Sequence, residues 1–83
     1  MKDLTAYGQL LQGHLLRAGV TTDELATMSS EAGYPVDGDV IDGHMHDYYY
    51  ERDNLNVVRG PAEVFGLDMK AKTKLAVAYL FNK

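Results

Sequence analysis

The residues best suited to chemistry lie between positions 37 and 50, where carboxylates, imidazoles and phenols follow one another closely. His44 and His46 stand two residues apart, so on a helix their side chains would point about 200° from each other and could not share one metal ion. Asp42 and His46 stand four residues apart and could supply two metal ligands from one helix face. A third ligand would have to come from elsewhere in the chain or from a second chain. We therefore interpret these side chains as surface polar groups and predict neither a metal site nor a cofactor.

Three consecutive tyrosines, Tyr48, Tyr49 and Tyr50, follow the histidines. We expect Tyr48 to pack inward and Tyr49 and Tyr50 to stay near the surface. Exposed tyrosines are enriched in protein interfaces, because they bury a large area at a low cost in conformational entropy. They also stack on nucleic-acid bases, so the tyrosines alone do not distinguish a protein partner from a nucleic acid.

The sign of the charge changes along the chain. Its 83 residues include 12 acidic and 8 basic side chains, a formal net charge of −4. Residues 23–53 contain 9 acidic side chains and 1 basic one, whereas residues 67–83 contain 1 acidic and 4 basic. A general nucleic-acid binder neutralises phosphates with Lys and Arg, so an acidic surface argues against that class. Beside the tyrosines, the acidic stretch favours a protein partner.

The length and composition are typical of one small globular domain spanning residues 1–83. A 46% share of apolar residues with 24% charged residues predicts a folded chain. The absence of cysteine excludes disulfides and thiolate metal sites. The longest apolar run, residues 75–81, is far shorter than a membrane span, and no secretory signal is apparent at the start. We predict a cytoplasmic protein that does not bind membranes.

Catalytic motifs are absent from the sequence. It lacks the phosphate-binding G-x-x-x-x-G-K-[ST] pattern, the nucleophile pattern G-x-S-x-G and the zinc pattern H-E-x-x-H. A helical chain of this length also has little room for a cleft. We therefore expect no enzymatic activity and no small-molecule substrate.

Apolar residues recur at helical spacing along nearly the whole chain, which predicts a compact all-α domain. We expect five helices, over residues 4–18, 22–32, 38–48, 61–66 and 69–82.

Local signals indicate where these helices begin. Thr21 and Glu24 have the spacing of a capping box, which predicts the start of the second helix. Asp3, Asp37 and Asp68 are the predicted N-caps of the first, third and fifth helices. The fourth helix is expected to begin at residue 61, a proline, which favours the first helical position.

Residues 19–26, GVTTDELA, resemble the G-[LI]-T-x-x-E-L-A signature of Cro/lambda-repressor-like helix-turn-helix domains of the XRE type. Residues 36–41 look like that family's turn and recognition helix, and residues 64–67 are similar to the segment that closes its fourth helix. The resemblance implies a small phage-type transcriptional regulator that binds DNA as a homodimer, with one helix in the major groove. The residues it implies at the DNA are Thr22, Asp37, Gly38, Asp39, Asp42 and His46. The candidates for phosphate contact are Arg17, Arg52 and Arg59.

The segment that resembles a recognition helix suggests an alternative function. Residues 37–47 contain no Arg, Lys, Asn or Gln, the side chains that read guanine and adenine. Asp37, Asp39 and Asp42 would instead lie beside phosphates. The alternative is an interaction module that keeps the helix-turn-helix fold and uses this acidic, tyrosine-bearing face to bind, and so to block, a basic protein surface.

The last predicted helix carries more apolar residues than one inward face can bury in so small a domain. Tyr79, Leu80 and Phe81 are its candidate interface residues. We expect the chain to form a homodimer through this helix.

Overall fold

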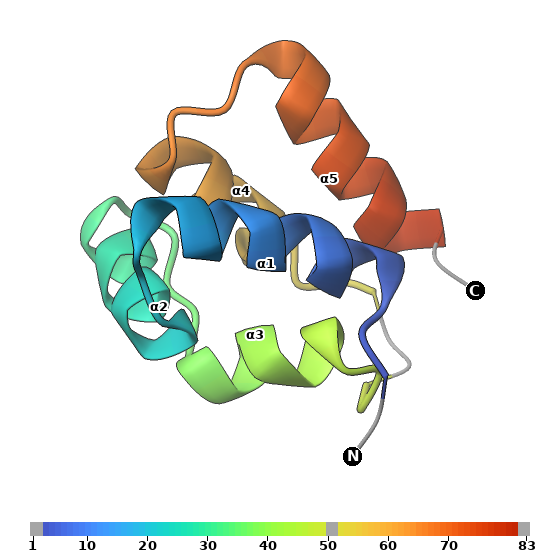
Figure 1. Cartoon of the computed structure of the whole chain (residues 1–83). Helices are drawn as coiled ribbons and strands as arrows, with labels where there is room; N and C mark the ends of the chain where they lie inside the picture. The colour runs from blue at the N-terminus through green and yellow to red at the C-terminus, as the bar shows by residue number, and fades with distance from the viewer. Residues whose placement is uncertain (1–2, 50–51, 82–83) are drawn as a thin grey trace.

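The computed structural model describes residues 3–49 and 52–81, and within these ranges the chain forms five α-helices and no strand (Figure 1). They are α1 (Ala6–Ala18), α2 (Thr22–Glu31), α3 (Gly38–Met45), α4 (Asn56–Val64) and α5 (Met69–Phe81). The predicted compact all-α domain of five helices is confirmed, and the radius of gyration of its Cα atoms is 11.2 Å. None of the described helices is long and apolar enough to cross a membrane.

The first helix begins after Thr5, so the prediction that Asp3 caps it is wrong. The Thr5 hydroxyl accepts a hydrogen bond from the Gly8 N–H at 2.9 Å and lies 3.0 Å from the carbonyl oxygen of His44. The Thr5 N–H donates to the carbonyl of Met45 at 2.8 Å. Thr5 therefore caps α1 and ties it to the end of α3, a tertiary contact that local sequence signals do not contain.

α1 and α3 approach each other closely at Gly8. A Cβ atom at this position would collide with the backbone of Met45. Glycine is required here because the two helix backbones leave no room for a side chain.

The capping box at the start of α2 is confirmed. The Glu24 N–H donates to the Thr21 hydroxyl at 3.1 Å, and the Thr21 N–H donates to the Glu24 carboxylate at 3.0 Å. The connection from α2 to α3 spans residues 32–37 and is longer than the turn of about three or four residues in a helix-turn-helix. α3 ends at Met45 and not at residue 48, because the chain leaves the helix through Asp47 at a positive φ of 60°.

α4 departs most from its prediction. It begins at Asn56 and ends at Val64, and Pro61 lies inside it instead of at its first position. Pro61 has no N–H, so the carbonyl of Val57 loses its helical donor. The Tyr7 hydroxyl donates to that carbonyl at 2.5 Å. A side chain from α1 thus replaces the hydrogen bond that the proline removes.

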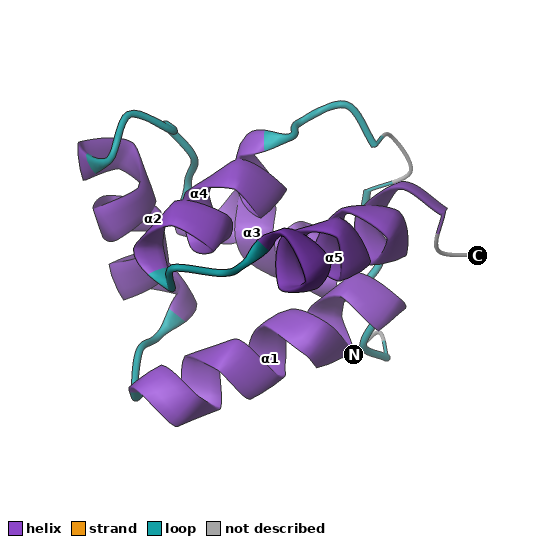
Figure 2. Cartoon of the chain, turned by 90° about the horizontal axis from the view of Figure 1, so that it is seen from above, coloured by secondary structure: helices purple, strands orange, loops and turns teal. Residues whose placement is uncertain are grey.

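α5 packs against α1 and α4 (Figure 2). The carboxylate of Asp68 caps it, as predicted, by accepting from the Ala71 N–H at 2.8 Å. Leu75 and Tyr79 face the core, and the ring of Tyr79 packs edge-on against Tyr7 with centroids 5.4 Å apart. Tyr79 is only 1% exposed, so its predicted place in an interface is wrong. Residue 82, the predicted last residue of this helix, lies outside the described residues.

Candidate functional site

Most of the residues predicted to contact DNA or a partner lie on one surface. This acidic surface comprises residues at the start of α2 and at the start and on the outer side of α3: Thr22, Asp23, Asp37, Asp39 and Asp42. The Thr22 hydroxyl donates to the Asp42 carboxylate at 3.2 Å. Gly38 leaves the space that the Asp23 carboxylate needs, since a Cβ there would collide with it. The hydrogen bond and the close approach at Gly38 place the start of α2 beside α3, so the four carboxylates lie on one surface.

Asp23 was not among the predicted contact residues. Its position next to Thr22, in the first turn of α2, is the signal that could have identified it. Residue 23 and residues 37–42 are far apart in the sequence, so local patterns do not predict that they lie together. They meet only because the connection over residues 32–37 reverses the direction of the chain.

The carboxylates of the acidic surface are open to solvent. Asp23, Asp37 and Asp39 are exposed, and Asp42 is half-buried. Asp37 occupies the N-cap position of α3 as predicted, but its side chain makes no capping hydrogen bond. The only ion pair within residues 3–49 and 52–81 joins Arg52 and Asp47, so none of these four carboxylates is in one. The surface therefore carries a negative charge that no described cation neutralises.

α3 presents few side chains to solvent, because most of it is buried. Gly38, Ile41, Gly43, His44 and Met45 are its buried residues. His46, another of the predicted contact residues, follows directly after α3 and is half-buried. Its ring centroid lies 6.4 Å from that of Tyr48. A partner that contacts the outer side of α3 would thus meet mainly carboxylates.

Tyr49 extends the acidic surface along α3. Its ring covers Gly43, where any Cβ would collide with it, and Gly43 lies one helical turn after Asp39. Tyr49 itself remains exposed, and its ring lies over Gly43, at the edge of the acidic surface. Tyr48 is also exposed, and the prediction that it packs inward is wrong because Tyr79, from α5, occupies the core position beside His44. Tyr50 lies outside the described residues.

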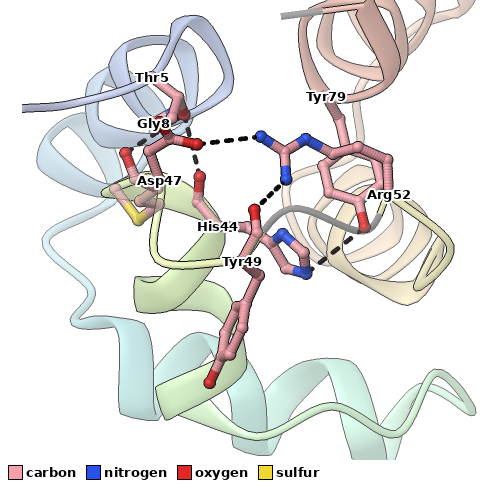
Figure 3. A network of polar contacts seen from close by, with 8 residues as sticks. Thr5, Gly8, His44, Asp47, Tyr49, Arg52 and Tyr79 are labelled. Carbon is pink, nitrogen blue, oxygen red and sulfur yellow. Dashed lines mark hydrogen bonds and ion pairs between the residues drawn. The ribbon is translucent and has the colours of Figure 1, made fainter.

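Arg52, a predicted phosphate contact, has a structural role in the connection between α3 and α4 (Figure 3). Its guanidinium donates to the carbonyl of Tyr49 and forms an ion pair with Asp47 at 3.3 Å. It also lies over the ring of Tyr79, 5.8 Å from the centroid. These contacts hold the guanidinium against its own chain, which makes phosphate binding by Arg52 unfavourable.

His44 lies in the same network, between the rings of Tyr49 and Tyr79 (Figure 3). Its Nε2 is 3.4 Å from the Tyr79 hydroxyl, and its Nδ1 is buried without a hydrogen bond. Burial, followed by the charge of Arg52, lowers the pKa of His44 below its usual value, against a smaller opposing effect of Asp53. The imidazole is therefore neutral at pH 7, and it helps to place Tyr49 at the edge of the acidic surface.

The two other predicted phosphate contacts, Arg17 and Arg59, lie outside α2 and α3. Arg17 donates to His14 Nδ1 at 3.1 Å and lies with Lys74 in a small cleft between α1 and α5. Burial and the charge of Arg17 lower the pKa of His14. Arg59 is exposed on α4. The three predicted phosphate contacts thus belong to three different parts of the molecule.

Within the described part of the chain, no three His, Asp or Glu side chains converge in a way that could hold a metal ion. No known protein family, curated protein or solved structure matches this chain. Its function is therefore inferred from the acidic surface and the residues around it.

Proposed function

We propose that the acidic surface binds a basic surface of another protein. The observation that carries the proposal is the set of carboxylates of Asp23, Asp37 and Asp39, which are exposed together without an ion pair to a described Lys or Arg. Such a surface attracts cationic groups and raises the rate at which a basic partner associates. Tyr49, at its edge, adds a phenol that can pack against the partner. Binding would cover the partner's basic surface and block it.

The same charges disfavour contact with DNA. In a helix-turn-helix domain the first residues of the recognition helix lie against base edges. At the start of α3 these are Asp37, Gly38 and Asp39, which would lie beside phosphates. Arg52 is bound to Asp47, and Arg17 faces α5. The DNA-binding regulator inferred from the resemblance stays a prediction, and it is the competing outcome of the experiment below.

The experiment compares two labelled probes, an arginine-rich peptide and a short mixed-sequence DNA duplex, by fluorescence polarisation. Asp39→Asn removes one charge from the acidic surface, and Glu63→Gln removes one from the exposed side of α4 as the matched control. An exposed ion pair contributes about 0.2–1 kcal/mol, so Asp39→Asn should weaken peptide binding by up to about fivefold. The control should change it by much less at about 150 mM salt, where charges more than about 8 Å away are screened.

The double variant Asp37→Asn/Asp39→Asn enlarges the expected effect. Neither carboxylate takes part in a cap or an ion pair, so helix content measured by circular dichroism should be unchanged. Equal losses of peptide affinity in Asp39→Asn and Glu63→Gln would overturn the assignment to this surface. DNA binding that exceeds peptide binding at about 50 mM salt and strengthens in the double variant would support the regulator instead.

A further inference from the structure

α1 and α5 pack side by side and leave a cleft of about 230 Å³ between them (Figure 2). Both helices contribute residues to its lining, which consists of Leu10, His14, Arg17, Ala71, Lys74 and Leu75. Positions 10, 14 and 17 share one face of α1, and positions 71, 74 and 75 share one face of α5, because residues about one helical turn apart lie on the same side. The acidic surface belongs to α2 and α3, so this cleft is a separate feature of the molecule.

Three side chains of the cleft can donate hydrogen bonds to a ligand. The Arg17 guanidinium donates to Nδ1 of His14 at 3.1 Å. Because Nδ1 is the acceptor in that bond, the proton of the neutral imidazole lies on Nε2. Burial, followed by the charge of Arg17, lowers the pKa of His14, so the ring is neutral at pH 7 and keeps its Nε2–H as a donor. The Lys74 ammonium supplies further N–H groups from the opposite helix.

Two of these donors are held in place by the rest of the chain. The His14 ring stacks on the ring of Phe65, with centroids 5.8 Å apart and planes inclined by 18°. The hydrogen bond to this ring in turn fixes the guanidinium of Arg17. Donors that are already ordered lose less conformational entropy when a ligand binds.

The positive charge of the cleft has no neutralising carboxylate in the described part of the chain. Within residues 3–49 and 52–81, neither Arg17 nor Lys74 forms an ion pair, and no acidic residue lines the cleft. Asp68 precedes α5, but its carboxylate caps the helix by accepting from the Ala71 N–H. Ala71 lies in the first turn of α5, where the helix dipole is positive. An anion in the cleft therefore meets two full positive charges and the positive end of a helix.

The rest of the lining is apolar. Leu10, Ala71 and Leu75 present only hydrocarbon to the cleft. An inorganic anion gains nothing from such walls, whereas an apolar chain leaves water when it packs against them. Small-molecule sites commonly combine apolar walls with a few polar groups, and those for drug-sized ligands have about 300–1,000 Å³. With about 230 Å³ this cleft suits a smaller ligand.

We propose that the cleft between α1 and α5 binds a small carboxylate that carries a short apolar chain. The carboxylate accepts from the Arg17 guanidinium, whose planar fork matches its two oxygens, and from the Lys74 ammonium. The Nε2–H of His14 is a further donor, and the apolar chain packs on Leu10 and Leu75. This inference does not depend on the proposed function, because the cleft and the acidic surface share no residue.

Titration of the isotope-labelled full chain, followed through its backbone amide chemical shifts, tests the ligand class. Three probes are compared at about 50 mM salt: hexanoate, hexanol, which has the chain without the charge, and inorganic phosphate, which has charge without the chain. We expect hexanoate to bind with a dissociation constant of about 0.1–10 mM, as a ligand of so few atoms allows, and the two others at least about fivefold more weakly. The shifts should centre on residues 10–17 and 71–75.

Four results of this titration would overturn the proposal. They are equal affinity for hexanol, equal affinity for phosphate, no response to about 50 mM hexanoate, and shifts that centre on the exposed Leu80 and Phe81 near the end of α5. The first would indicate a site for any apolar molecule, and the second a site for charge alone.

Variants test the residues of the cleft. Lys74→Gln should weaken hexanoate binding by about two- to fivefold, the contribution of an exposed ion pair. Lys72→Gln is the matched control, because Lys72 is equally an exposed lysine of α5 but does not line the cleft; its effect should stay below about 1.5-fold. Equal effects of the two variants would contradict the assignment.

Ala71→Glu places a carboxylate in the cleft itself. Glutamate is favourable at the third position of a helix, so circular dichroism should show an unchanged helix content. The new carboxylate competes for Arg17 and Lys74, and hexanoate binding should weaken at least about tenfold. Affinity for hexanoate that persists in Ala71→Glu would overturn the proposal.

Discussion

Replacing Tyr7 by Phe tests how the chain tolerates a proline inside α4. The Tyr7 hydroxyl is buried and donates to the carbonyl of Val57, whose helical donor is missing because residue 61 is proline. Burial, followed by the effect of Tyr79, raises the pKa of Tyr7 well above its usual value, so the hydroxyl keeps its proton and remains a donor. Loss of the donor leaves a buried carbonyl unsatisfied, which costs about 1–3 kcal/mol.

The measurement is the free energy of unfolding, from urea denaturation followed by circular dichroism. In a domain of this size each 1 kcal/mol lowers the melting temperature by about 4–8 °C. Pro61→Ala restores an N–H that can donate to Val57. In that background the cost of Tyr7→Phe should fall by at least about 0.5 kcal/mol, the coupling expected of two groups that serve one acceptor.

Tyr79→Phe is the matched control, because Tyr79 is equally buried but its hydroxyl accepts from the Asn54 N–H and does not contact Val57. Its cost should be the same in the native chain and in the Pro61→Ala background. If Tyr7→Phe costs less than about 0.5 kcal/mol, or costs the same in both backgrounds, the Tyr7 hydroxyl does not substitute for the missing helical donor.

The packing and the charges lead to three further predictions. Gly8→Ala should destabilise the fold by about 1–3 kcal/mol or more, because the new side chain would collide with the backbone of Met45. Gly13→Ala should stabilise it by about 0.5–1 kcal/mol, because the nearest atom to a Cβ there is in the Arg17 guanidinium, 3.6 Å away. Urea denaturation measures the free energy of unfolding of both variants, and equal effects would contradict the close approach of α1 and α3 at Gly8. His14 and His44 have folded pKa values below the 6.5 of the unfolded chain, so the unfolded state takes up protons first on acidification. The contribution of these two histidines to the free energy of unfolding should therefore be constant above about pH 7.5 and fall as the pH drops through 6.5 towards the folded pKa values; a urea midpoint that rises on acidification below about pH 7.5 would disprove this. Arg52→Gln should lower the free energy of unfolding by about 1 kcal/mol or less, as is usual for a surface ion pair. It should also speed amide hydrogen exchange at Asn54, whose N–H donates to the Tyr79 hydroxyl beneath the arginine. Unchanged exchange at Asn54 would show that Arg52 does not hold the segment between α3 and α4 in place.

Local hydrogen bonds explain which elements could be predicted from the sequence. The capping box of Thr21 and Glu24 and the cap of Asp68 on Ala71 each close within three residues. Such contacts depend only on neighbouring residues, so the pattern of residue types identifies them. The start of α2 and the start of α5 were accordingly predicted correctly.

The errors share a physical cause. α4 begins five residues earlier than predicted because the donor that makes Pro61 tolerable comes from Tyr7, far away in the sequence. Thr5 replaces Asp3 as the cap of α1 because its hydroxyl also contacts the end of α3. In both cases a contact between distant residues outweighs the local preference.

The sequence by itself determined that the chain is all-α, that it has five helices, and that its acidic residues are concentrated between positions 23 and 53. Helical periodicity and the distribution of charge along the chain depend only on residues that are close in the sequence, so they can be recognised without knowing how the helices pack. Only the tertiary structure decided that Asp23 joins the aspartates of α3, that Arg52 is bound to Asp47, and that Tyr48 is exposed. These outcomes depend on which side of each helix faces its neighbours, and that is settled only when all five helices pack together.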